Sequence, residues 1–117
     1  MWFAAHIITV FRYRKRRQRK FRVWENIVLV QAATPEEGWK KARELGEESV
    51  RDGSDWTVNG LPATLDYVGV RKLIDVDDPE KRPKHGTEIT YNKFDLSSRA
   101  DLEKLVAGDP VSIEYEE

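Results

Sequence analysis

The sequence contains no cysteine, and this absence excludes disulfide bonds, thiolate metal sites and cysteine nucleophiles. Histidine occurs only twice among the 117 residues, without the paired spacing of a metal site such as His-x-x-x-His. No apolar run reaches the roughly 20 residues that a membrane-spanning helix requires, and no basic leader precedes the first apolar stretch. We therefore expect a soluble cytoplasmic protein that binds no metal ion or cofactor and does not engage a membrane.

Catalytic signatures are also missing from the sequence. It holds no glycine-rich phosphate loop, no nucleophile elbow and no kinase motif. At 117 residues, the chain has the length of one domain that can bury a core without covalent cross-links. The sequence therefore favours a single domain over residues 1–117 and leans away from an enzyme, although it identifies no specific role.

Positive charge is concentrated in one segment. The chain has 20 basic and 21 acidic side chains, and its net charge is −1 at pH 7. Residues 12–22 contribute eight positive charges and no negative ones, so the rest of the chain carries a net charge of −9. The eight basic residues are Arg12, Arg14, Lys15, Arg16, Arg17, Arg19, Lys20 and Arg22. Such an asymmetry bears on how the protein meets its partners and says little about its fold.

Two apolar-rich segments flank this basic stretch. Residues 2–13 and 21–33 are both rich in β-branched and aromatic side chains, and each predicted strand has apolar residues on both faces. Because the connection between them is short, we expect the two strands to pair as an antiparallel hairpin. The basic residues 12–22 would then form a turn that projects beyond the sheet.

The second strand leads into a predicted helix over about residues 35–49. Thr34 is a suitable N-cap, Pro35 suits the first helical position, and Glu37 completes a capping box. The apolar stripe of this helix consists of Trp39, Ala42, Leu45 and Gly46. We expect this stripe, and Trp39 above all, to pack into the core.

The remaining chain alternates between turns and further elements. The predicted strands cover residues 56–58, 63–76, 87–96 and 111–115, and a polar loop covers residues 77–86. A second helix starts after Ser98 and stops at Gly108. The predicted order is β-β-α-(β)-β-β-α-β. It indicates an α+β fold with a mainly antiparallel sheet of about five strands and two helices on one face.

Several sequence blocks, taken together, resemble one protein family. The blocks are residues 2–6 (WFAAH), 23–27 (VWENI), 62–64 (PAT), 69–73 (GVRKL), 86–91 (GTEITY) and 102–115. They resemble the bacterial domain-of-unknown-function 4288 family, and the resemblance covers almost the whole chain. It implies a small stand-alone bacterial domain, and it brings no activity, ligand or catalytic residue with it.

The basic segment allows two interpretations. Lys and Arg neutralise phosphates, and Tyr13 and Phe21 flank the cluster as candidate stacking platforms, which is typical of nucleic-acid binding. Alternatively, the segment is a solvated loop whose charge keeps a long hairpin soluble and discourages edge pairing. The same charges would also suit an acidic protein partner or the acidic face of a second copy.

Three ionisable residues, His6, Glu25 and Arg71, occur within apolar strands. Buried charges need partners, so we expect a Glu25–Arg71 ion pair across adjacent strands. The cluster is either a satisfied structural network or the lining of a pocket that positions an anionic ligand. Trp24 and Asn26 flank Glu25 and join it as candidate ligand or partner contacts.

Together these patterns favour a non-catalytic protein-interaction or regulatory module. An immunity-type protein would fit this description. Its contacts would be made by the sheet face or the hairpin tip, with a protein partner or a second copy as the occupant. The alternative is a nucleic-acid-binding protein that uses the basic hairpin of residues 12–22. A third hypothesis is an enzyme or small-ligand binder centred on His6, Glu25 and Arg71.

Overall fold

The computed structural model describes residues 1–52, 55–76 and 82–116. Its elements are β1 (Trp2–Tyr13), β2 (Arg22–Gln31), α1 (Pro35–Ser49), β3 (Trp56–Val58), β4 (Leu61–Asp75), β5 (Phe94–Asp95), α2 (Arg99–Ala107) and β6 (Glu114–Tyr115). Their order along the chain matches the prediction, and the α+β class with an antiparallel sheet is confirmed. Residues 77–81 of the predicted polar loop lie outside the described residues.

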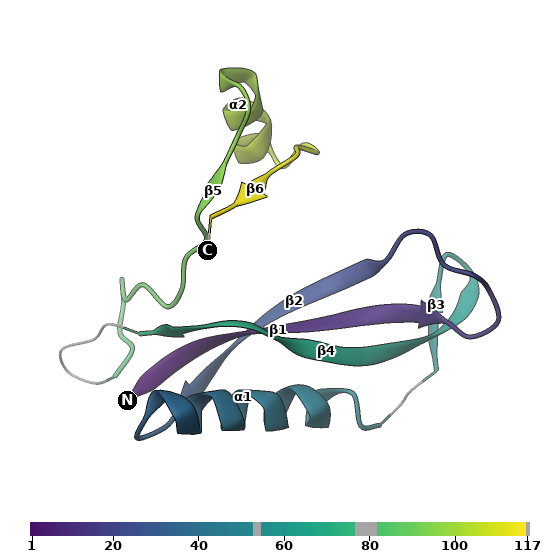
Figure 1. The fold of residues 1–117 in the computed structure, drawn as a ribbon. Helices are drawn as coiled ribbons and strands as arrows, with labels where there is room; N and C mark the ends of the chain where they lie inside the picture. The colour runs from purple at the N-terminus through teal and green to yellow at the C-terminus, as the bar shows by residue number, and fades with distance from the viewer. Residues whose placement is uncertain (53–54, 77–81, 117) are drawn as a thin grey trace.

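Four strands form one antiparallel sheet in the order β2-β1-β4-β3 (Figure 1). The predicted pairing of the first two strands is confirmed, with a register that runs from Trp2↔Gln31 to Phe11↔Arg22. On its other side β1 pairs with β4. β1 therefore has a neighbour on both sides, whereas β2 is an edge strand.

β4 is irregular opposite the middle of β1. The register of its pairing with β1 shifts at two places along β1, between His6 and Ile7 and again between Ile8 and Thr9. A bulge turns two successive side chains toward the same side of a strand. Arg71 and Lys72 consequently share the face of the sheet that carries His6.

α1 packs against the other face of the sheet through its smallest residues. Gly38, Ala42 and Gly46 are its buried positions, and they lie over large side chains of β1 and β4 such as Phe3 and Tyr67. The prediction that Trp39 belongs to the core was wrong: its side chain is only half-buried. The sheet supplies the bulky groups at this contact, so the helix supplies the small ones.

The start of α1 has the predicted N-cap, Thr34, but the return bond of the expected capping box is shifted by one residue to Ala33. The hydroxyl of Thr34 accepts a hydrogen bond from the backbone N–H of Glu37 at 3.1 Å. The Glu37 carboxylate accepts in return from the backbone N–H of Ala33 at 3.1 Å. The first bond satisfies one of the unpaired N–H groups at this helix end, and the second ties the helix to the residue before the N-cap.

The C-terminal elements differ in detail from the expected arrangement. β5 and β6 form a separate two-stranded sheet, so the main sheet has four strands. The expectation that both helices cover one face was wrong: α2 stands clear of the main sheet, on the side opposite to α1 (Figure 1), and none of its residues is buried. The expected strand over residues 87–96 shrinks to β5. Part of this segment is held by side chains on the sheet: Lys72 Nζ donates to the backbone carbonyl of Tyr91 at 2.5 Å.

We call the face of the sheet opposite to α1 the open face. Besides His6 it carries a group of exposed apolar side chains, which are Val23, Ile27, Leu29 and Val68. The α1 face holds the two buried clusters of the core, one under the helix and one around Phe11, Val58 and Ala63. The sheet thus has one covered face and one that is covered only in part.

Candidate functional site

His6, Glu25 and Arg71 meet on the open face. Nδ1 of His6 lies 2.5 Å from Oε2 of Glu25, and NH1 of Arg71 donates to the same oxygen at 3.1 Å. The His6 side chain has no exposed surface. The predicted Glu25–Arg71 ion pair therefore exists, but it does not join adjacent strands, because β1 and its His6 lie between β2 and β4.

Thr90 is a fourth member of this cluster, and no local sequence pattern indicates its role. Its hydroxyl forms a hydrogen bond with Nε2 of His6. On the other side of the cluster, the Arg71 guanidinium lies over the ring of Tyr115, 4.1 Å from the ring centroid. The cluster therefore attaches the C-terminal segment to the sheet at two points that are 25 residues apart in the sequence.

The order hydroxyl, imidazole and carboxylate also occurs in the catalytic triads of hydrolases. A triad acts on a substrate that reaches its nucleophile and its histidine. Here the imidazole of His6 is completely buried, and each of its ring nitrogens already has a partner. The arrangement satisfies buried polar groups and fixes the position of Thr90.

Trp24 and Asn26 lie on the α1 face, because side chains alternate along β2. Oδ1 of Asn26 accepts a hydrogen bond from the hydroxyl of Thr9 at 3.4 Å. The ring of Trp24 meets those of Phe11 and Trp56 edge-to-face, with centroid distances of 4.9 and 5.6 Å. The structure therefore separates these two candidates from Glu25 and assigns them to the opposite face.

The basic segment contains two paired cations. Nε of Arg12 lies 3.1 Å from a carboxylate oxygen of Asp66, and NH2 of Arg14 lies 2.5 Å from one of Asp55. The other six form no ion pair with any residue in the described part of the chain, and all are exposed; they are Lys15, Arg16, Arg17, Arg19, Lys20 and Arg22. The concentration of charge predicted from the sequence thus remains largely uncompensated.

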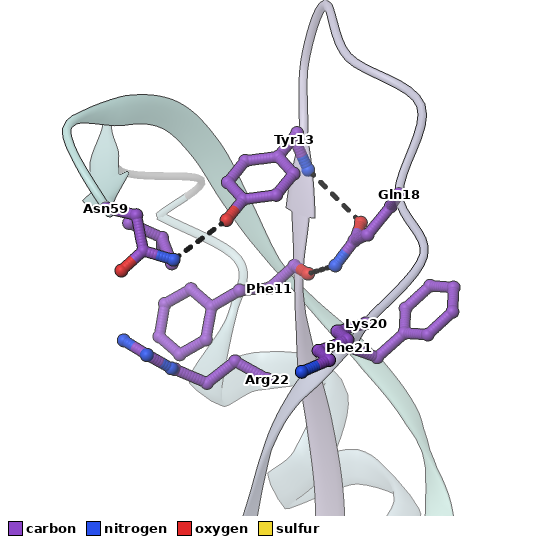
Figure 2. A pocket seen from close by; sticks show the side chains of 8 residues that line it. Phe11, Tyr13, Gln18, Lys20, Phe21, Arg22 and Asn59 are labelled. Atoms are coloured by element: carbon purple, nitrogen blue, oxygen red, sulfur yellow. Dashed lines mark hydrogen bonds between the residues drawn. The ribbon is translucent and has the colours of Figure 1, made fainter.

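The loop between β1 and β2 is folded back onto β1 by Gln18. Its side-chain amide donates to the Phe11 carbonyl at 2.7 Å and accepts from the Tyr13 backbone N–H at 3.4 Å. Asn59, in the turn between β3 and β4, donates to the Tyr13 hydroxyl at 3.2 Å (Figure 2). These bonds hold the loop, β1 and the β3–β4 turn around a common cavity.

This cavity has a volume of about 260 Å³. Its walls are aromatic and basic, and they include Phe11, Tyr13, Lys20, Phe21 and Arg22 (Figure 2). Sequence reasoning identified the cations, Tyr13 and Phe21. It missed Asn59, whose contact with Tyr13 spans 46 positions and depends on β3 and β4 returning to the end of β1.

Fold and sites define a small α+β domain with one helix-covered sheet face and no open catalytic centre in the described residues. A family model described as Domain of unknown function (DUF4288) matches residues 2–91, and the chain belongs to this family. The matched region includes the four hydrogen-bonded residues of the cluster, which are His6, Glu25, Arg71 and Thr90. No curated protein and no solved structure matches the chain. Neither helix in the described ranges has the length and apolar character needed to cross a membrane.

Proposed function

We propose that the protein is a non-catalytic protein-interaction module that assembles with a second copy of itself through the open face. One observation carries this proposal: the chain presents two apolar surfaces that it leaves uncovered. The first is the group of Val23, Ile27, Leu29 and Val68 on the open face. The second is the apolar stripe of α2.

The stripe of α2 consists of Leu102, Leu105 and Val106, whose side chains are 54%, 37% and 89% exposed. An amphipathic helix gains most of its stability when its apolar stripe packs on another surface. The chain's own open face is an unsuitable partner, since the bonds of Thr90 and Tyr115 to the sheet leave α2 standing clear of it. The open face of a second copy is free of this constraint.

Charge favours the same pairing. Among residues 94–116 six carboxylates accompany only two basic side chains, Arg99 and Lys104. On the open face the cations Arg12, Arg71 and Lys72 outnumber the carboxylates Glu25 and Asp66. Residues 94–116 of one copy are thus acidic, whereas the open face of the other copy is slightly basic. If the two copies are related by a two-fold axis, α2 of each copy packs on the open face of the other.

Four variants test this assembly by light scattering. Val106→Glu and Leu29→Asp each place a charge in the proposed contact, and we expect both to yield monomers. Ala100→Glu adds the same charge to the opposite side of α2. Leu45→Asp alters a residue of α1 that is 41% exposed, close to the 43% of Leu29, and both controls should remain dimeric.

A wild-type protein that is monomeric at all concentrations would refute the proposal. So would dimers that survive Val106→Glu and Leu29→Asp but dissociate in the Leu45→Asp control.

A further inference from the structure

We propose that the corner of the α1 face next to the basic loop binds single-stranded nucleic acid. The corner consists of the cavity of Figure 2 and the adjoining ring of Trp24. It lies on the face opposite to the proposed dimer contact, so the two proposals stand independently.

The first observation is an aromatic cluster beyond α1 in which the ring of Trp24 is exposed while that of Phe11 is buried. α1 covers the sheet near Phe3 and Ile7. Beyond that, Phe11, Trp24 and Trp56 pack edge-to-face with each other, and 42% of the Trp24 surface remains exposed. Exposed aromatic rings held rigidly by neighbouring rings are suitable platforms for stacking nucleobases.

The second observation is the position of the exposed cations. Lys20 and Arg22 line the same cavity as the rings of Tyr13 and Phe21, and further exposed cations precede them in the loop. Gln18 ties this loop to β1, which keeps the cations beside the rings. A nucleotide has both a ring that stacks and a phosphate that pairs with cations, and this corner presents partners for both within one cavity.

The size and charge of the corner favour a single strand over a duplex. In a duplex the faces of the bases are stacked on one another and are not accessible to protein rings. A cavity of about 260 Å³ is smaller than the roughly 300–1,000 Å³ of a site for a drug-sized ligand, and it suits one nucleoside. Because the rest of the chain carries a net charge of −9, phosphate contacts are confined to the loop.

Fluorescence anisotropy with a labelled ten-nucleotide oligouridine and a duplex of equal length tests this inference. We expect the single strand to bind at least tenfold more tightly than the duplex at 50 mM salt. With up to six phosphate contacts, the logarithm of the association constant should fall with the logarithm of the salt concentration with a slope between about −2 and −4. Binding near 0.15 M salt should accordingly be weak.

Two kinds of variant separate stacking from charge. Phe21→Ala and Trp24→Leu should each weaken oligouridine binding about fivefold or more without flattening the salt dependence. Phe21 is 54% exposed, so its replacement leaves the fold intact even if Trp24→Leu does not. Replacing Arg19, Lys20 and Arg22 with serine should weaken binding at least tenfold and flatten the slope. Replacing Lys40, Arg43 and Arg51 with serine removes equal charge elsewhere and should have little effect.

Three results would overturn the inference. The first is no binding of oligouridine at 50 mM salt, and the second is equal affinity for the duplex. The third is binding of polyglutamate as tight as that of oligouridine and insensitive to Phe21→Ala. That result would assign the loop to an acidic protein partner instead.

Discussion

Gly46 of α1 lies directly against the aromatic ring of Tyr67 in β4. A Cβ atom at position 46 would lie 2.6 Å from Cδ1 of that ring. Such a distance is shorter than any normal contact between carbon atoms, so the missing side chain sets how closely the helix approaches the sheet. Tyr67 in turn fills the space between the two layers together with Ile7.

Gly46→Ala should therefore destabilise the protein, although alanine is the better helix former. The gain in helix propensity is about 1 kcal/mol, whereas overpacking against the Tyr67 ring costs about 1–3 kcal/mol. We expect a lower urea midpoint for unfolding. Gly69→Ala is the control, because no atom lies within 4 Å of a Cβ at that position. If the Gly46→Ala protein is as stable as the wild type, α1 and the sheet must lie further apart at this point than the contact between Gly46 and Tyr67 implies.

Glu37 should make the stability of the fold depend on pH. Its hydrogen bond to Lys41, and then its bond to the Ala33 backbone N–H, hold the pKa of its carboxyl below the ordinary value. A carboxyl with a lowered pKa in the folded state stabilises the fold above its unfolded pKa, and this stabilisation is lost as the pH falls through the folded pKa. Glu37→Gln should thus lower the urea midpoint at pH 7 and make progressively less difference toward pH 3.

Glu36→Gln is the control for this pH dependence, since it removes a carboxylate from the same helical turn but leaves the bonds of Glu37 to Ala33 and Lys41 in place. A difference between Glu37→Gln and wild type that stays constant with pH would contradict the assignment.

Thr90→Val should release the C-terminal segment from the sheet. The substitution keeps the shape of the side chain and removes the hydroxyl that bonds to His6. We expect backbone amides around residues 88–93 to exchange with deuterium severalfold faster, while those of β1 and α1 are unchanged. In the control Thr87→Val, the lost hydroxyl accepts from the Lys84 backbone N–H within its own turn. Equal exchange in the wild type and Thr90→Val would mean that His6 does not hold the segment.

Glu25→Ala should destabilise the whole domain. It leaves the buried imidazole of His6 and the guanidinium of Arg71 without their carboxylate. Removing one partner of a fully buried ion pair costs roughly 3–5 kcal/mol. The Glu25 side chain is still 24% exposed, so we expect about 2–3 kcal/mol from denaturation curves. A decrease in the free energy of unfolding below about 0.5 kcal/mol, as is usual for a surface residue, would show that the bonds of Glu25 to His6 and Arg71 do not stabilise the fold.

Local sequence signals predicted the elements that depend on neighbours in the chain. The capping residue Thr34 predicts the start of α1, and the two apolar-rich segments with a short connection predict the hairpin of β1 and β2. These features follow from periodicity and from backbone hydrogen bonding within a few residues, so no tertiary information was needed.

The errors concern contacts between distant segments. The helical spacing of apolar residues predicts that Trp39 belongs to the core stripe, but the bulky rings of the sheet select Gly38 and Gly46 as the contact residues of the helix. The role of Thr90 depends on a partner 84 positions away. Such pairings are set by the strand order and by the bulges of β4, and no local pattern encodes either.

Sedimentation equilibrium of the wild-type protein tests the proposed assembly most directly. The chain has a mass of 13.6 kDa. The proposed exchange of α2 between two open faces predicts a reversible rise to twice that mass with increasing protein concentration, and no larger species, since a two-fold contact closes on itself. A mass that stays at that of one chain, or one that grows without limit, would contradict it.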